Sequence, residues 1–129
     1  MRLLLDTNIL LWVLLQPARL DAAAFALIED ERNSVLFRVT SIWEIAIKAR
    51  LGRDDFNARP GAVNQFALNA GFEVLPVQAD AAIRVADLPM HHRDPFDRLL
   101  VAQAMAGPMR LLTSDPVLRQ YSELVMLVG

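Results

Sequence analysis

The sequence predicts an α/β fold, a three-layer α/β/α sandwich with a central parallel sheet of about five strands. Short apolar runs alternate along the chain with longer segments of helical periodicity, and this alternation is typical of parallel strands joined by helical crossovers. Hydrophobic residues make up 54% of the 129 residues, so the chain is long enough to bury a core. Because no linker-like segment interrupts the pattern, we expect a single domain over residues 1–129.

The first half of the chain is expected to form two strands and three helices. In order, these are a strand at 2–5, helices at 8–16 and 21–30, a strand at 35–39 and a helix at 41–51. The first strand is apolar and stops sharply at Asp6. Asp21 is placed to cap the second helix, and Gly52 to close the third. The run at 35–39 contains Val and Phe, which favour strands.

The second half of the chain begins with a predicted loop. In order, we expect a loop at 53–61, a helix at 62–70, a strand at 72–77, helices at 80–87 and 95–106, a strand at 110–113, a short helix opened by Pro116 and an edge strand at 125–128. Charge, proline and glycine mark the loop. The helix at 95–106 has the clearest periodicity, with apolar side chains recurring three and four residues apart. Gly71 and Gly107 mark helix ends.

Four acidic residues stand where apolar runs end and helices begin. They are Asp6, Glu44, Asp97 and Asp115. Ligands of parallel α/β sheets bind beyond the carboxyl ends of the strands, so we expect these carboxylates to meet in one crevice. A group of carboxylates without histidine or cysteine suits hard divalent cations such as Mg²⁺ and Mn²⁺. The sequence therefore predicts a metal-dependent phosphodiesterase, and a nuclease first of all.

Each acid also has a structural alternative as a helix cap. Asp94 and Asp115 each precede a proline, which matches an N-cap followed by proline at the first helical position. Asp94 with Asp97 has a spacing similar to a capping box, and Ser41 with Glu44 has a better one. Capping works equally well with Ser, Thr or Asn, so it does not require a carboxylate at all four positions. The joint pattern therefore favours the metal site.

The predicted chemistry follows from the acids. One or two Mg²⁺ ions would bind a phosphate, lower the pKa of a bound water and stabilise the leaving oxygen. Such chemistry depends on positioning and electrostatics, so it needs no covalent nucleophile. Polar side chains beside the acids are expected to orient the ligands or the water. These are Thr7, Asn8, Thr113 and Ser114.

The charge of the whole chain does not indicate a nucleic-acid partner, because the net charge is −2. Local charge matters more where a polyanion approaches a metal site. Lys48, Arg93 and Arg98 follow or flank the acids and are expected to guide a phosphate backbone. The alternative for each of these side chains is a solvated helix face.

Two histidines and two tryptophans invite further hypotheses. His91 and His92 are the only histidines in the chain, and carboxylate sites work without one, so we expect no direct catalytic role for either. Trp12 and Trp43 lie at apolar spacing on predicted helices. We expect them in the core or at a partner surface rather than as stacking platforms for bases.

Four segments carry a resemblance to a known family. They are LLLDTNILLW, SIWEIAIKARLG, LPMHHRDPFDRLLVAQA and LLTSDPVLRQY. Together they resemble the PIN domain, and specifically the VapC-type toxins of type II toxin–antitoxin pairs. The family fold is a parallel five-stranded sheet between helices. The residues that match the family's acidic metal site are Asp6, Glu44, Asp97 and Asp115.

Two other residues are interpreted through the same resemblance. Asp94 matches an extra acid of the family. It is expected to cap a helix and to help position the metal ligands without binding the metal itself. Arg38 departs from the pattern, since relatives tend to carry a small residue six positions before Glu44. An arginine there is expected either to contact RNA phosphate or to intrude on the metal site.

The resemblance also implies an activity and partners. Members of the family are Mg²⁺- or Mn²⁺-dependent ribonucleases that act on cellular RNA. They form homodimers and are held inactive by a small antitoxin protein that inserts a segment near the active site. We therefore expect a cytoplasmic endoribonuclease toxin. The alternative is a catalytically silent PIN-like module that binds RNA or a partner, and the presence of all four acids argues against it.

Other classes of protein fit the sequence less well. The N-terminal segment resembles a signal peptide, but Asp6, Thr7 and Asn8 divide its apolar stretch. The remaining run at 9–15 is too short to span a bilayer, so we expect no membrane association. A phosphoacceptor domain would need a lysine after a late strand, and none follows LLTSD. A P-loop enzyme would need a glycine-rich phosphate loop, which is absent from the sequence.

Overall fold

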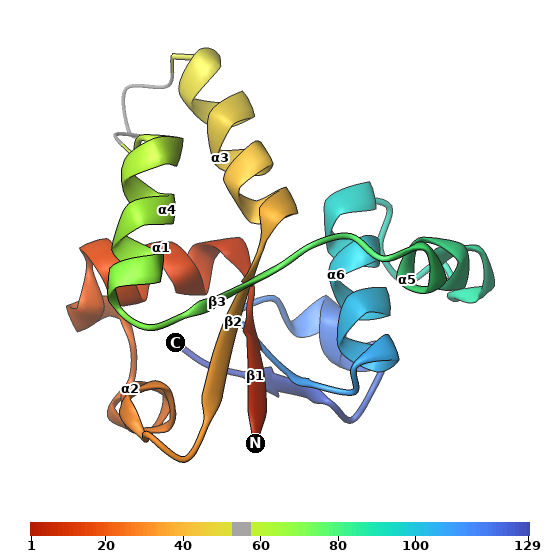
Figure 1. Cartoon of the computed structure of the whole chain (residues 1–129). Helices are drawn as coiled ribbons and strands as arrows, with labels where there is room; N and C mark the ends of the chain where they lie inside the picture. The colour runs from red at the N-terminus through yellow and green to blue at the C-terminus, as the bar shows by residue number, and fades with distance from the viewer. Residues whose placement is uncertain (53–57) are drawn as a thin grey trace.

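The computed structural model describes residues 1–52 and 58–129, which form a parallel sheet enclosed by helices (Figure 1). The strands are β1 (Arg2–Leu5), β2 (Ser34–Arg38), β3 (Glu73–Leu75), β4 (Arg110–Thr113) and β5 (Val125–Leu127). The α-helices are α1 (Thr7–Leu15), α2 (Ala22–Glu29), α3 (Val39–Arg50), α4 (Pro60–Asn69), α5 (Ala79–Arg84) and α6 (Pro95–Ala106). Short 3₁₀ helices are η1 (Pro17–Arg19), η2 (Val85–Asp87) and η3 (Pro116–Gln120).

The strands form a five-stranded sheet in the order β3-β2-β1-β4-β5. Every neighbouring pair is parallel, and Leu4 of β1 is aligned with Leu36 of β2 and Leu111 of β4. Parallel neighbours require crossover connections, which the helices between the strands supply. The predicted α/β class with a central parallel sheet of five strands is confirmed, and β5 is an edge strand as expected.

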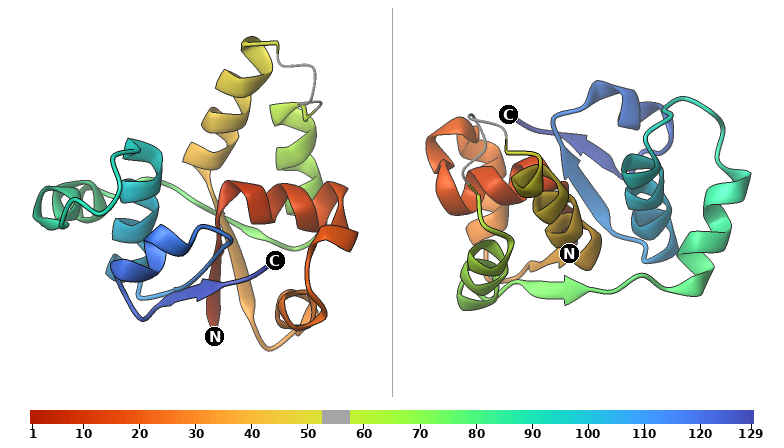
Figure 2. Two further views of the ribbon diagram at one scale, coloured as in Figure 1. Left: turned by 180° about the vertical axis from the view of Figure 1, so that it is seen from behind. Right: turned by 90° about the horizontal axis from the view of Figure 1, so that it is seen from above.

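Side chains of the central strand alternate between two apolar layers. Leu3 and Leu5 pack against residues of α1, α2, α3 and α4, whereas Leu4 packs against α6. Helices therefore cover both faces of the sheet, which makes three layers (Figure 2). A strand buried on both faces needs consecutive apolar residues, and all three leucines are fully buried. Burial of each leucine side chain contributes about 2 kcal/mol to folding.

Helix α1 follows β1 with a single residue between them. Asp6 is that residue, and its extended backbone and its side chain, which accepts from the Thr7 amide, make it the N-cap. The helix therefore begins one residue before the predicted start at residue 8. Because strand and helix are joined so tightly, the Asp6 carboxylate is fixed at the carboxyl edge of the sheet.

Helix α3 excludes the capping box of Ser41 and Glu44 that was the structural alternative for these residues. The helix begins at Val39, and Arg38 occupies the N-cap position without a side-chain capping bond. The Ser41 hydroxyl and the Glu44 carboxylate instead contact the hydroxyl of Thr7. Their tertiary partner on α1 replaces the local backbone partners that the spacing suggested.

Only part of the predicted loop at 53–61 lies within the described residues. Residues 53–57 lie outside the described residues. At its other end the prediction is wrong, because α4 begins at Pro60 and includes Gly61. Proline fits the first turn of a helix, where its missing amide has no partner to lose. Gly71 follows the helix with a φ of +85°, as expected for a residue that ends a helix.

The remaining elements agree with the prediction apart from their limits. Helix α6 has the predicted bounds. The helix expected at 80–87 divides into α5 and η2. The strand expected at 72–77 is shortened to β3, consistent with Pro76, which has no amide to donate to a neighbouring strand. Within the described residues, every helix is too short or too polar to cross a membrane.

Candidate metal centre

The four predicted acids meet at the carboxyl edge of the sheet. The N-termini of α1, α3 and α6 also lie at this edge (Figure 1). Asp6 follows β1, and Asp115 follows β4. Glu44 projects from α3, which directly follows β2, and Asp97 from the first turn of α6. These acids line a cavity of about 200 Å³, whose other lining residues are Thr7, Asn8, Lys48, Asp94 and Ser114.

Asp6 is buried at the base of the cavity, with both oxygens engaged. Its Oδ1 accepts from the Thr7 amide at 2.7 Å, and its Oδ2 accepts from the Thr113 hydroxyl at 2.6 Å. Burial raises the pKa of Asp6, while the hydrogen bond from Thr113 and the positive charge of Arg38 act in the opposite direction. Thr113, expected to orient a ligand, therefore holds an Asp6 oxygen in place.

Glu44 is held by one neighbour on α1 and another on its own helix. The Thr7 hydroxyl lies 2.8 Å from Glu44 Oε1 and 2.9 Å from the Ser41 hydroxyl. Lys48, one turn further along α3, lies 3.3 Å from Glu44 Oε2. Thr7 thus links the first turn of α1 to the acid of α3. The two oxygens of Glu44 are held by a hydroxyl and an ammonium group.

Asp97 and Asp115 share a partner, His92. The Nε2 atom of His92 lies 3.2 Å from Asp97 Oδ2 and 3.2 Å from Asp115 Oδ2. His92 Nδ1 accepts from the Asp94 amide at 3.1 Å, so the proton of a neutral ring is on Nε2, from which it donates to the carboxylates. His92 therefore connects α6 to the segment after β4.

Sequence reasoning missed His92, because it assumed that a carboxylate site needs no histidine. The available signal was its position two residues before Asp94 in the HHRDPFD segment. The neighbouring His91 does not share this geometry. Its ring packs edge-on against Tyr121, with 4.9 Å between the ring centres.

The pKa of Asp97 is the clearest sign that negative charge is crowded here. Burial raises it to about 7, and the charges of Asp6 and Asp94 contribute to the rise. A positive charge on the His92 ring would lower the pKa of Asp97 and so oppose this effect. A carboxylate whose ionisation is opposed by neighbouring carboxylates gains stability when a cation binds among them.

Asp94 lies beside these acids and caps α6. Its Oδ1 accepts from the Phe96 amide at 2.8 Å, as the predicted N-cap requires. The reciprocal half of the suggested box with Asp97 is absent, because the Asp94 amide donates to His92 instead. Asp115 is likewise an N-cap, since its Oδ1 accepts from the Val117 amide at 3.0 Å.

The predicted basic residues divide into two exposed or half-exposed side chains and two buried ones. Lys48 lies on the wall of the cavity, and Arg93 is exposed. Arg38 is fully buried, and its Nη1 donates to the Phe96 carbonyl at 3.1 Å. Arg98 is also buried and donates to backbone carbonyls, including that of Val85 at 3.0 Å. The burial of Arg38 and Arg98, which are 0% and 8% exposed, contradicts the predicted contact with RNA phosphate.

The two tryptophans differ in their surroundings. Trp12 packs against the apolar layer of α1 to α4, and the Arg19 guanidinium lies 4.7 Å above its ring. Trp43 is 59% exposed, and its ring packs against that of Phe96 with 5.2 Å between the ring centres. Of the two expected positions, the core and a partner surface, the exposure of Trp43 excludes only the core.

The donor set of the cavity fits a hard divalent cation. Its lining offers carboxylates, hydroxyls and an amide, which are the oxygen donors that Mg²⁺ and Mn²⁺ prefer. Oxygen atoms of Asp97 and Asp115, together with a His92 nitrogen, lie within 4.8 Å of one another. This spacing brings ligands from two separate elements within reach of one ion.

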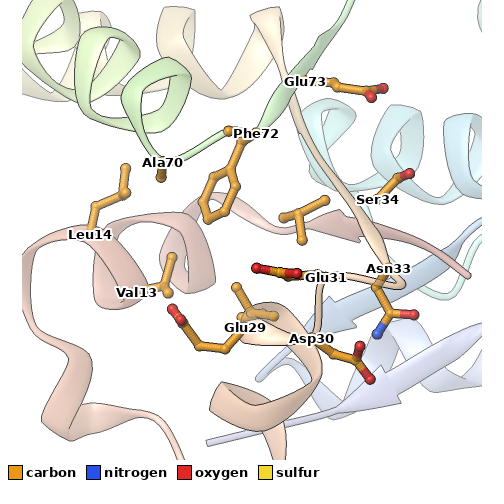
Figure 3. A pocket seen from close by; sticks show the side chains of 13 residues that line it. Val13, Leu14, Glu29, Asp30, Glu31, Asn33, Ser34, Ala70, Phe72 and Glu73 are labelled. Atoms are coloured by element: carbon orange, nitrogen blue, oxygen red, sulfur yellow. The ribbon is translucent and has the colours of Figure 1, made fainter.

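A larger hollow of about 450 Å³ lies at the opposite edge of the sheet (Figure 3). It is lined by Ser34 and Glu73, at the amino ends of β2 and β3, and by the acidic segment 29–31. Val13 and Phe72 form part of its apolar wall. None of the four predicted acids lines it, so it is separate from the metal centre.

Fold and site together define a parallel α/β protein with a carboxylate cation site at the carboxyl edge of its sheet. A family model described as the PIN domain matches residues 3–124. The chain belongs to the PIN domain family. No curated protein sequence matches it.

A solved structure with the same fold is that of VapBC2 from Rickettsia felis, bound to a DNA fragment from the VapBC2 promoter. The TM-score is 0.75 at 14% sequence identity, and the alignment covers 100% of both chains. At this identity the likeness shows the fold, and it agrees with the assignment to the PIN family.

Proposed function

We propose that this protein is a Mg²⁺- or Mn²⁺-dependent endoribonuclease, the VapC-type toxin of a type II toxin–antitoxin pair. The observation that carries the proposal is the meeting of Asp6, Glu44, Asp97 and Asp115 around one cavity of a PIN domain. The likeness to a chain of VapBC2 supports the toxin class. The proposed site of action is RNA in the cytoplasm, in keeping with the toxin class.

Asp97 and Asp115 are the first candidates to hold the cation, with Asp6 and Glu44 completing the set. The bound ion supplies positive charge to the phosphate and makes a water molecule more acidic. Thr7 and Thr113 hold Glu44 and Asp6 in position, so the ligands need little rearrangement.

The remaining residues of the cavity orient the site or approach the substrate. Asp94 fixes the first turn of α6, and Asn8 and Ser114 offer polar groups at the rim. Lys48 and Arg93 are the basic side chains able to meet an RNA backbone. In this proposal the protein contributes placement and electrostatics, and no side chain forms a covalent intermediate.

The test is cleavage of total cellular RNA by the purified protein in Mg²⁺, Mn²⁺ or EDTA. Asp6→Asn and Asp97→Asn should abolish cleavage while leaving the circular dichroism spectrum unchanged, because each removes a charged ligand. Asp87→Asn is the matched control, since Asp87 is an exposed acid on η2 and does not line the cavity.

The results separate the nuclease from its alternative, a catalytically silent PIN-like module that binds RNA or a partner. Cation-dependent cleavage that is lost in Asp6→Asn but kept in Asp87→Asn supports the nuclease. Folded protein that binds RNA without cutting it in any cation supports the silent module. Cleavage that persists in EDTA or in both active-site variants would refute a cation-dependent mechanism.

The proposal includes two protein partners, a small antitoxin and a second copy of the chain. Support for the dimer comes from α3, where exposed apolar side chains recur every four residues. They are Val39, Trp43 and Ile47, followed by Leu51 at the C-cap of the helix. A stripe of this kind is typical of a surface that another protein covers.

Light scattering tests the proposed dimer directly. Ile47→Lys should convert the protein to a monomer, because it places a charge in the middle of the apolar stripe. Phe66→Lys, at an exposed position of α4, is the control and should remain dimeric. The antitoxin is tested by purifying the chain after co-expression with the small gene beside its own, where stable co-purification and loss of RNA cleavage are expected.

A further inference from the structure

Arg38 is a buried charge that the proposed reaction does not use. It is fully buried, at the end of β2. Its Nη1 donates to the Phe96 carbonyl at 3.1 Å and lies 3.5 Å from Gln103 Oε1. Within the described residues, its Nε and Nη2 atoms have no hydrogen-bond partner, and no carboxylate lies within ion-pairing distance.

The position of Arg38 connects it to the acids from three sides. Since β1 and β2 are in parallel register, with Leu4 beside Leu36, Arg38 ends its strand beside Asp6. It is also the N-cap of α3, which carries Glu44. Its bond to Phe96 places the guanidinium at the first turn of α6, one residue before Asp97.

A guanidinium remains charged in a protein, even where burial opposes the charge. Burial lowers the pKa of Arg38, and the strongest opposing influences are the charges of Asp6 and Glu44, followed by those of Asp97 and Asp94. Without a direct ion pair, this charge is stabilised at a distance by the same carboxylates that would bind a divalent cation. The guanidinium and the cation therefore compete for one set of negative charges.

We propose that Arg38 is an internal counter-charge that weakens divalent-cation binding and limits the carboxylate centre to one ion. The proposal rests on the proposed function, because it assigns a cation to the same centre. It also accounts for an arginine in a buried position from which RNA cannot be reached.

The charges around the cavity support a limit of one ion. Five carboxylates and Lys48 line it, and Arg38 supplies a second positive charge that interacts with four of these carboxylates. When all five carboxylates are ionised, one divalent cation leaves a single excess negative charge, whereas a second makes the centre positive. If Arg38 were neutral, two divalent cations would be needed to balance the carboxylates. Loss of the guanidinium should therefore strengthen the first binding step and permit a second.

The experiment is a Mn²⁺ titration of the full chain, followed by the electron paramagnetic resonance signal of free Mn²⁺. Arg38→Met removes the charge at similar volume, and Arg38→Lys keeps the charge. We expect one bound ion for the unmodified protein and for Arg38→Lys. For Arg38→Met, we expect at least tenfold tighter binding of the first ion and a second bound ion.

The charge-keeping variant separates electrostatics from packing, because both substitutions change the contact with Phe96. Circular dichroism and thermal melting verify that each variant is folded. If Arg38→Met is unfolded, Arg38→Gln replaces it, since glutamine is neutral and can still donate to the Phe96 carbonyl. Readout by bound Mn²⁺ does not depend on catalysis.

The outcomes distinguish this proposal from the function on which it rests. Unchanged affinity and stoichiometry in folded Arg38→Met would overturn the counter-charge role. Tighter binding of a single ion would overturn the limit on the number of ions. Equal tightening in Arg38→Lys would show a packing effect and also overturn the proposal. If Mn²⁺ binds to Asp97→Asn as tightly as to the unmodified protein, Asp97 does not hold the cation. The carboxylate centre is then not the cation site, and both proposals fail.

Discussion

Removal of the charge on Asp97 should stabilise the cation-free protein at alkaline pH. The pKa of Asp97 is raised from 3.8 to about 7, first by burial and then by the charges of Asp6 and Asp94. At pH 8 the folded chain therefore contains a carboxylate whose ionised form is disfavoured. Asp97→Asn keeps the size of the side chain and removes this unfavourable charge.

The sign and size of the effect follow from proton linkage. Between about pH 4 and pH 7 the folded chain binds more protons at Asp97 than the unfolded chain, so the contribution of Asp97 to stability decreases as pH rises through this window. The rise in pKa corresponds to about 4 kcal/mol at most. Solvent reaches 20% of the side chain, and screening reduces the expected gain in Asp97→Asn at pH 8 to about 1–2 kcal/mol. For a chain of this length, that is an increase of about 4–7 °C in Tm.

The assay is thermal unfolding in EDTA at pH 5 and pH 8, for the unmodified protein, Asp97→Asn and the control Asp87→Asn. The advantage of Asp97→Asn should be large at pH 8 and small at pH 5. Millimolar Mg²⁺ at pH 8 should raise the Tm of the unmodified protein, because ligand binding stabilises the folded state, and should have less effect on Asp97→Asn. Equal Tm values for Asp97→Asn and the unmodified protein at pH 8 in EDTA would refute the reasoning about crowded charge.

Three further predictions concern residues that support the site or the core. Arg98→Met should lower the free energy of unfolding by about 2–4 kcal/mol in urea titrations, because four backbone carbonyls lose a buried donor; a loss below about 1 kcal/mol would contradict this role. Thr113→Val should weaken Mn²⁺ binding severalfold in a titration followed by electron paramagnetic resonance. The reason is that Asp6 Oδ2 loses its 2.6 Å donor and the pKa of Asp6 rises further. Unchanged affinity would show that Thr113 does not position Asp6. Leu100→Ala should lower the unfolding free energy by about 2–5 kcal/mol in urea, because this side chain is fully buried between α6 and the sheet; a surface-like loss would contradict its place in the core.

The order and type of the elements could be predicted because each follows from local pattern. Consecutive buried leucines occupy the middle of β1 and β4, as strands buried on both faces require. Helix α6 combines a capping acid, a proline at its start and a clear apolar repeat, and its bounds agree with the prediction. Helix α3 lacks such a local start signal, so its first residue was predicted two positions too late.

Features that depend on tertiary contacts were beyond the sequence. Nothing near Arg38 in the chain indicates that its guanidinium points to the Phe96 carbonyl, 58 residues further on. The role of His92 likewise depends on Asp115, which lies on another element. By contrast, the meeting of the four acids could be predicted, because parallel strands bring their carboxyl ends to one edge.

Helix capping and cation binding were set against each other as explanations of the acids, but the geometry makes them compatible. Asp6, Asp94 and Asp115 each use Oδ1 to accept from an amide at the start of a helix. In Asp6 and Asp115 the second oxygen meets a side-chain donor, the Thr113 hydroxyl or His92 Nε2. Capping therefore fixes the orientation of each carboxylate and places it near the positive end of a helix dipole. An amide such as Asn could preserve the cap but would remove the charge, so Asp6→Asn should keep the fold and lose cation binding, which separates the two roles within one side chain.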